Sequence, residues 1–306
     1  MPIPPNTALG VGLNVAGSLF FALMFAYAPL LPLLDGGELY GWRMLLTFPC
    51  LTLFILRYGY GWQVALAYRR LRVERLFWAT RLLGAALLGA QLWLFMWAPG
   101  NGQALAVSLG YFLMPIIMVL IGRLAFGDRL SRLQKVASLL ALAGATNQLL
   151  SSQALAWPTL LVCLGYPFYF WLRRATDTNH LGGLWFDMLL ALPLCLYFVL
   201  RGGEAIGAPG LDVILLILGL GLLSTLALVC QALSAPLLNL SLFGLLVYVE
   251  PLLLFLVALG LGETVSSREW PTYIAIWLAV TVLALEGVLG VRRARRQRRP
   301  AWRAEN

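Results

Sequence analysis

Long apolar runs separated by short polar segments make up nearly the whole chain. A helix needs roughly 20 apolar residues to cross the hydrocarbon core of a bilayer. Short connections between such helices favour antiparallel neighbours in a compact bundle. The expected fold is therefore an all-α polytopic membrane protein with ten transmembrane helices. These helices are predicted at residues 7–31, 38–57, 75–97, 103–122, 132–150, 154–173, 183–200, 211–234, 240–261 and 268–291.

One pattern occurs twice along the chain: an apolar run with an internal proline, a glycine–acid pair, and a second apolar run. The first copy has Pro115 and a Gly-Asp pair at 127–128, and the second has Pro251 and a Gly-Glu pair at 262–263. A repeat that keeps all of these features indicates duplication of one unit. Each pair is also followed by a Ser-x-x-Gln/Glu capping box, which is typical of a helix start. The capping pairs are Ser131 with Gln134 and Ser266 with Glu269.

The duplication divides the predicted helices into two sets of five. The first five-helix repeat covers residues 1–150, the second covers 151–291, and a basic tail follows at 292–306. Because five is an odd number of crossings, the second repeat enters the membrane inverted relative to the first. Inverted repeats are typical of secondary transporters, whose site lies near mid-membrane between the halves. A duplication kept only for stability is the alternative.

Composition and charge support a membrane location. Of the 306 residues, 61% are hydrophobic and 11% are charged, which is more apolar surface than a soluble domain can bury. The formal net charge is +9, but the basic residues gather at span ends and in the tail. This is the positive-inside distribution rather than a nucleic-acid-binding groove. We therefore expect a multi-pass protein of the inner membrane with both termini in the cytoplasm.

Few residues are suited to metal, cofactor or hydrolytic chemistry. The four cysteines lie singly within apolar runs, and the single histidine, His180, lies in a polar loop without a second ligand candidate nearby. Neither a zinc site nor a disulfide framework is indicated. The phosphate-binding Gly-x-x-x-x-Gly-Lys motif does not occur in the sequence. We expect no metal, no cofactor and no enzymatic activity.

Several charged residues lie within the predicted spans, where a charge costs at least ~2.5–3.5 kcal/mol and usually serves function. Glu250 is expected to contact a substrate amine or to carry a proton, and a neutral, hydrogen-bonded core acid is the alternative. Arg43 could attract a substrate carboxylate or pair with Glu38. Asp187 could act in gating, pair with an arginine or snorkel, whereas Arg81 is expected to snorkel to the membrane surface.

Uncharged polar residues in the spans form a second set. They recur at similar depth in different helices, so together they are expected to surround a central pocket of mixed aromatic and amide character. The alternative is that each one hydrogen-bonds a neighbouring helix. With Glu250, the predicted substrate-binding residues are Asn14, Gln91, Tyr111, Tyr166, Gln231 and Tyr248, and Pro115 and Pro251 are expected to break their helices.

Several of these segments also match a family pattern. They are SLGYFLMP at 108–115 followed by Gly-Asp-Arg at 127–129, QLWLFMW at 91–97, Glu38 with Arg43, Asp187 before Pro193, and Tyr248 with Pro251 before residues 262–263. Together they resemble the RarD-type members of the EamA branch of the drug/metabolite transporter superfamily. The resemblance covers essentially the whole chain and is strongest across 87–145. Met114 stands where the family commonly has asparagine, and Trp42 stands where it has histidine.

This resemblance implies a ten-helix permease that often exports small metabolites, in a family whose label mentions chloramphenicol. We therefore expect a secondary-active permease that exports small organic metabolites or drug-like solutes, similar to chloramphenicol or to amino acids, by alternating access, with protonation of Glu250 as the coupling step. A lipid translocator or scramblase of the same fold is the alternative. The expected partners are a small-molecule substrate, protons and the lipid bilayer, without nucleic acid.

Overall fold

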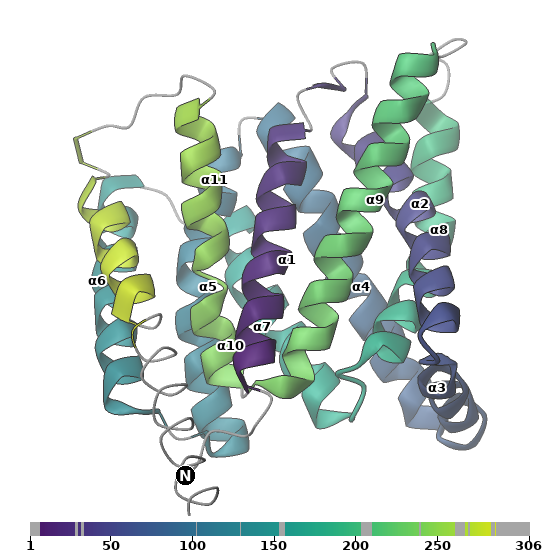
Figure 1. Cartoon of the computed structure of the whole chain (residues 1–306), viewed down its shortest axis with the longest axis horizontal. Coiled ribbons are helices and arrows are strands. Elements are labelled where there is room, and N and C mark those ends of the chain that lie inside the picture. The colour runs from purple at the N-terminus through teal and green to yellow at the C-terminus, as the bar shows by residue number, and fades with distance from the viewer. Residues whose placement is uncertain are drawn as a thin grey trace, which may run out of the picture.

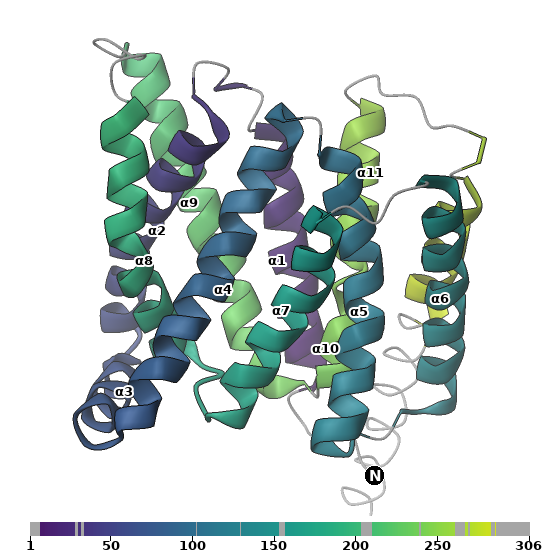
Figure 2. The ribbon, with the colours of Figure 1, turned by 180° about the vertical axis from the view of Figure 1, so that it is seen from behind.

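The computed structural model describes residues 7–27, 30–31, 34–101, 103–128, 130–152, 157–202, 210–238, 240–260, 267–268, 270–282 and 285. Within these residues the secondary structure is helical, without strands. Figures 1 and 2 show the long helices standing side by side as one bundle. The helices are α1 (Thr7–Tyr27), α2 (Gly36–Arg57), α3 (Gly61–Val73), α4 (Arg75–Gly100), α5 (Ala104–Phe126), α6 (Arg132–Ser152), α7 (Trp157–Ala175), α8 (Leu181–Gly202), α9 (Leu211–Ser234), α10 (Leu240–Leu246) and α11 (Val249–Gly260), followed by a helical segment at Trp270–Val282.

Five of the described helices are long and apolar enough to cross a membrane. By length and composition these candidate spans are Thr7–Met24, Gly36–Arg57, Arg75–Ala98, Leu181–Gly202 and Leu211–Leu237. Shorter apolar helices occur at Leu113–Phe126, Leu242–Leu253 and Trp270–Val282. A multi-pass membrane protein built from α-helices is therefore confirmed. Within the tenth predicted span, residues 268, 270–282 and 285 are described, and the tail at 292–306 and the pair at 262–263 lie outside the described residues.

The additional helix α3 was not among the predicted spans. It is amphipathic, with Gln63, Ala67 and Leu71 buried at four-residue spacing and Trp62 and Arg72 exposed. At 13 residues it is too short to cross a bilayer. Figure 1 shows it lying across one end of the bundle, which we call the α3 end.

The helix start predicted at Ser131 is confirmed. The Gln134 amide donates to the Ser131 hydroxyl and the Ser131 amide donates to the Gln134 side-chain oxygen, each over 3.1 Å. The preceding helix, α5, ends at Phe126 and is capped by Gly127, whose φ of +65° favours glycine because it has no Cβ. The equivalent capping box at Ser266 lies outside the described residues.

The two prolines occupy different backbone environments, and the helix break predicted at Pro115 is wrong. Helix α5 is continuous through Pro115, because neighbouring turns hold the helix although the proline cannot donate to the carbonyl of Tyr111. Around Pro251 the chain is irregular: α10 ends at Leu246 and α11 begins at Val249. Pro251 lies in the first turn of α11, where a missing amide leaves no intrahelical bond unmade.

Helices α5 and α7 pack closely at Gly110. A Cβ at this position would lie 2.6 Å from Val162 Cβ and 2.9 Å from the Thr159 carbonyl oxygen. We expect Gly110→Ala to lower the free energy of unfolding by about 1–3 kcal/mol, because the two helices must move apart. Thermal unfolding of the detergent-solubilised protein measures the effect. Gly12→Ala on α1 is the control, since its Cβ would meet nothing within 4 Å, and an equal loss in both variants would contradict the packing argument.

Candidate functional site

A narrow cavity lies near the centre of the bundle, among α1, α2, α4, α5, α7, α9 and the break between α10 and α11. It thus lies between helices of the first predicted repeat and helices of the second. The volume that the centre of a water molecule can occupy inside the cavity is about 20 Å³. This volume is enough for one or a few waters. A larger solute therefore requires the cavity to open. Its lining residues are Phe21, Arg43, Leu92, Phe95, Tyr111, Met114, Tyr166, Phe170, Gln231, Val247 and Glu250.

Arg43 is completely buried on α2. Its Nε donates to the Ser224 hydroxyl over 2.9 Å, which ties α2 to α9. Its guanidinium carbon lies 5.7 Å from the centre of the Phe21 ring and 6.0 Å from that of Phe95. Both terminal nitrogens lack a hydrogen-bond partner among the described residues. The predicted alternative, a pair with Glu38, is wrong, because Glu38 forms a capping box with Asp35 at the start of α2.

Glu250 faces the same cavity from the first turn of α11 and is 4% exposed. The start of a helix favours an acidic side chain, because the backbone amides there carry partial positive charge. No ion pair joins Glu250 to Arg43 in the described part of the chain. The cavity is therefore lined by one basic and one acidic side chain that do not pair directly.

Two tyrosines and a glutamine complete the polar lining. The rings of Tyr111 and Tyr166 lie 5.9 Å apart between their centres, and Tyr166 stacks on Phe170 at 6.4 Å. Gln231 comes from the last turns of α9. Of the predicted polar and charged site residues, the structure thus brings five together in one cavity: Arg43, Tyr111, Tyr166, Gln231 and Glu250.

The other predicted site residues lie elsewhere. Gln91 donates from α4 to the Leu161 carbonyl of α7 over 2.6 Å, so it links two helices. Tyr248 packs in a separate buried cluster with Leu252. Asn14 is buried in α1, and its amide atoms have no hydrogen-bond partner within the residues that the structure describes. None of the three lines the cavity.

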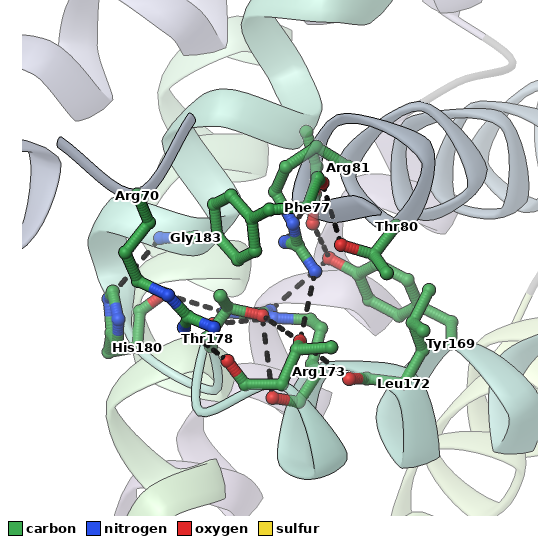
Figure 3. A network of polar contacts seen from close by, with 12 residues as sticks. Arg70, Phe77, Thr80, Arg81, Tyr169, Leu172, Arg173, Thr178, His180 and Gly183 are labelled. Atoms are coloured by element: carbon green, nitrogen blue, oxygen red, sulfur yellow. Dashed lines mark hydrogen bonds and ion pairs between the residues drawn. The ribbon is translucent and has the colours of Figure 1, made fainter. Parts of the chain in front are cut away.

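Asp187 belongs to a second polar site, near the α3 end. Its carboxylate accepts from Arg81 and from the Tyr169 hydroxyl, each over 3.0 Å. Arg173 donates to the Tyr169 hydroxyl over 3.2 Å, and Arg81 donates to the Thr176 hydroxyl over 3.2 Å. Figure 3 shows these arginine and tyrosine side chains converging. We call these five residues the Asp187 network.

The prediction that Arg81 snorkels to the membrane surface is wrong, because its side chain and that of Asp187 are both 0% exposed. A buried arginine requires a partner, and this partner lies 106 residues away in sequence on α8. The pairing therefore joins α4 of the first predicted repeat to α8 of the second. The only signal in the sequence was an arginine several residues inside an apolar run.

The Gly-Asp pair at 127–128 also makes a contact between the two predicted repeats. Both carboxylate oxygens of Asp128 accept from Arg174 at the end of α7, over 3.2 and 3.3 Å. The Arg174 guanidinium also lies over the Phe126 ring, 4.2 Å from its centre. This two-point pair holds the α5–α6 connection against α7.

His180 lies in the loop before α8 and accepts a hydrogen bond from the Gly183 amide at its Nδ1, over 3.3 Å. Burial first, and then the positive charge of Arg173, lower the pKa of His180 from 6.5 to about 4. The folded state therefore resists a proton that the unfolded state binds. We expect a stability contribution that is complete above pH 6.5 and is lost as the pH falls to about 4.

Thermal unfolding midpoints across this pH range test this expectation. His180→Asn keeps a capping acceptor but cannot titrate, so the difference between wild type and variant should change between these pH values. A constant difference would contradict the account.

Comparison with known proteins identifies the family. No family model matches the chain. It is 40% identical over 293 residues to the chloramphenicol-sensitive protein RarD of Pseudomonas aeruginosa, covering 94% of this chain and 97% of the relative. It is 33% identical over 285 residues to an uncharacterized transporter of Pasteurella multocida, covering 93% of this chain and 98% of the relative. A protein of known crystal structure shares the fold, with a TM-score of 0.60 and 16% identity over 94% of this chain and 98% of its own. The chain therefore belongs to the RarD family of transporters.

Proposed function

We propose that this protein is a secondary-active permease of the inner membrane that exports small organic solutes by alternating access. The observation that supports this most strongly is the position of Arg43 and Glu250. Both are buried, they come from opposite predicted repeats, and they line one cavity. Charged groups inside a membrane bundle usually mark a pathway for substrate or protons. The sequence motifs favour membership of this protein in the EamA branch of the drug/metabolite transporter superfamily.

The pairing of helices supports an inverted repeat. Suppose that α1 corresponds to α7, α4 to α9, and α5 to the α10–α11 pair. Each contact between two helices should then recur between the two corresponding helices of the other half. Helix α1 packs on α9, and α7 packs on α4. Helix α1 also packs on α10 and α11, and α7 packs on α5. This exchange is the pattern expected of two halves related by a pseudo-twofold axis.

The contacts at the α3 end support a gate. The Asp187 network and the Asp128–Arg174 pair both join the first predicted repeat to the second there. The same end carries Arg57 and the arginines of α3, so we propose that it faces the cytoplasm. In this state the gate is closed, and rocking of the halves would open it to admit a solute from the cytoplasm.

Glu250 is the proposed coupling residue. It is the acidic residue of the cavity lining, and a proton delivered there from outside would change the charge that a solute meets. The solutes proposed are small metabolites or drug-like compounds, and the name of the Pseudomonas relative makes chloramphenicol one of the compounds to test.

Release from liposomes tests the proposal. Purified protein is reconstituted into vesicles that hold a mixed pool of metabolites, amino acids and chloramphenicol, and mass spectrometry follows what leaves with and without a pH gradient. We expect selective, protein-dependent loss of one chemical class, faster with the gradient. Protein-free vesicles are the control. Movement of a fluorescent lipid between leaflets without solute loss would instead favour the lipid translocator.

A further inference from the structure

Helix α3 has one face packed on the bundle and two exposed edges, one apolar and one basic. We infer that α3 lies in the headgroup region of the membrane and binds anionic phospholipids. Its arginines contact the lipid phosphates, and its apolar edge contacts the acyl chains. This surface lies outside the cavity, so the inference does not depend on which solute the protein moves.

The connections of α3 place it at the membrane boundary. The candidate span in α2 ends at Arg57 and the one in α4 begins at Arg75, and α3 (Gly61–Val73) occupies most of the chain between them. Because both ends of α3 lie next to a span end, the helix runs along the membrane surface, as its position across the bundle in Figure 1 shows. Tyr58 and Trp78 are exposed on either side of it, and such aromatic residues are typical of the headgroup level.

The inner face fixes α3 to the start of α8. The Gln63 side-chain oxygen accepts a hydrogen bond from the Gly182 amide over 3.2 Å. Ala67 and Leu71 belong to a buried cluster with Phe186 of α8. The rotation of α3 about its own axis is therefore set by the protein, which determines where its other two edges point.

The apolar edge consists of Trp62, Leu66 and Val73, which are 63%, 46% and 82% exposed. At 3.6 residues per turn these three side chains fall within about 40° of one another around the helix. An apolar edge beside a basic one is typical of helices that lie in the membrane interface, with the apolar residues at the boundary of the acyl chains.

The basic edge lies next to the apolar one and has little internal compensation. Between residues 57 and 75 the chain has five arginines and one glutamate. The glutamate, Glu74, is already held by both Nε and a terminal nitrogen of Arg70, over 2.9 and 3.0 Å. The other four arginines are exposed and have no carboxylate partner in the part of the chain that the structure describes; they are Arg57, Arg69, Arg72 and Arg75.

Charge complementarity identifies the occupant. Arginine binds phosphate oxygens through two parallel hydrogen bonds, and phosphate is the anion found at the headgroup level of a membrane. Basic residues at this level attract anionic lipids. A ligand with an anionic head and an apolar tail matches both edges of α3 at once, whereas a soluble acidic partner would leave the apolar edge uncovered.

The inner side of α3 also touches the Asp187 network. Arg70 donates to the Thr176 carbonyl over 2.7 Å, and the Thr176 hydroxyl accepts from Arg81. Figure 3 shows the Arg70 side chain beside this network. A lipid that holds α3 in place therefore also supports these contacts, so bound anionic lipid should raise the unfolding temperature of the protein.

Lipid binding to the purified full chain tests the inference. Native mass spectrometry in detergent compares phosphatidylglycerol, which is anionic, with phosphatidylcholine, which has no net charge, both with the same acyl chains. We expect phosphatidylglycerol to bind about tenfold or more tightly than phosphatidylcholine and to raise the unfolding temperature. Glycerol phosphate at the same concentration supplies the headgroup without the tail and should do neither.

Variants on the two edges assign the contacts. Arg69→Gln with Arg72→Gln should weaken phosphatidylglycerol binding by about 25-fold, or about fivefold for each arginine, and leave phosphatidylcholine binding unchanged. Arg69→Lys with Arg72→Lys keeps both charges and should retain most of the binding. Leu66→Ser with Val73→Ser should weaken the binding of both lipids alike. The matched control is Arg201→Gln, which removes an exposed arginine of α8 outside this surface.

A probe on the apolar edge tests its contact with lipid independently. In a variant whose four native cysteines are replaced, Leu66→Cys carries a fluorophore, and the protein is placed in lipid nanodiscs with brominated acyl chains. We expect clear quenching at this position. Leu53→Cys, in the candidate span of α2 and 66% exposed, gives the quenching of a lipid-facing reference.

Three results would overturn the inference. One is equal binding of the two lipids, and another is an unchanged preference for phosphatidylglycerol in the double glutamine variant. The third is an unquenched probe at position 66, which would show that the apolar edge faces water and is available to a soluble partner instead. A rise in unfolding temperature with glycerol phosphate alone, equal to that with the lipid, would reduce the site to one for free phosphate and would contradict the lipid assignment.

Discussion

Replacing Asp187 with alanine is expected to lower the free energy of unfolding by about 3–5 kcal/mol, because it leaves a buried arginine without its counter-charge. Arg81 and Asp187 are both 0% exposed, so water cannot take the place of the missing carboxylate. The Tyr169 hydroxyl loses its acceptor in the same variant. Denaturant or thermal unfolding of the detergent-solubilised protein measures the loss.

Two comparisons make this prediction specific. Glu74→Ala removes a carboxylate that also pairs with an arginine, Arg70, but those side chains are 47% and 29% exposed; such a pair contributes about 0–1 kcal/mol. Replacing Arg81 and Asp187 together with leucine should destabilise the protein less than Asp187→Ala, since Arg81 is then not left without its counter-charge. If Asp187→Ala and Glu74→Ala cost the same, the burial argument is wrong.

Replacing Glu250 with glutamine is expected to slow gradient-driven solute release by about tenfold or more, in line with the loss of one charged contact in a buried site. Glutamine keeps the shape of the side chain but neither gains nor loses a proton. The remaining release should therefore respond little to the pH gradient. Initial rates from liposomes at several gradients, divided by the amount of reconstituted protein, give this comparison.

The matched control is Asp212→Asn, which changes an exposed acid in the first turn of α9, outside the cavity. It should leave both the rate and its pH dependence unchanged. Unaltered, gradient-dependent release in Glu250→Gln would remove Glu250 as the proposed coupling residue.

The five candidate spans found among the described residues were predictable, because bilayer thickness and hydrophobicity determine such spans almost alone. Helix α3 was missed because it is short and amphipathic, so it gives no span-length signal. The helix break expected at Pro115 did not occur, because the neighbouring turns hold α5 together around one lost hydrogen bond. Around Pro251, the chain is irregular a turn earlier, between Leu246 and Val249.

The polar part of the cavity was predictable for a similar reason: a charge or amide within an apolar run stands out. Phe21, Phe95 and Phe170 line the same cavity but look like any other apolar residue of a membrane helix. Pairings were not predictable, since the Arg81–Asp187 bond depends on the register of two helices that are distant in sequence. For the same reason, sequence alone did not separate Gln91, which links α4 and α7, from Gln231, which lines the cavity.

The central claim is that solutes cross the protein through this cavity, and chemical blockade of its lining tests it most directly. In a variant whose four native cysteines are replaced, Met114→Cys introduces a single thiol into the lining of α5. Leu120→Cys is the control, because Leu120 lies on the same helix but is 52% exposed and outside the cavity. Solute release from liposomes is measured before and after treatment with a small thiosulfonate reagent. We predict that treatment stops release in Met114→Cys, that excess solute protects against it, and that Leu120→Cys is unaffected; full release from fully modified Met114→Cys would contradict the account.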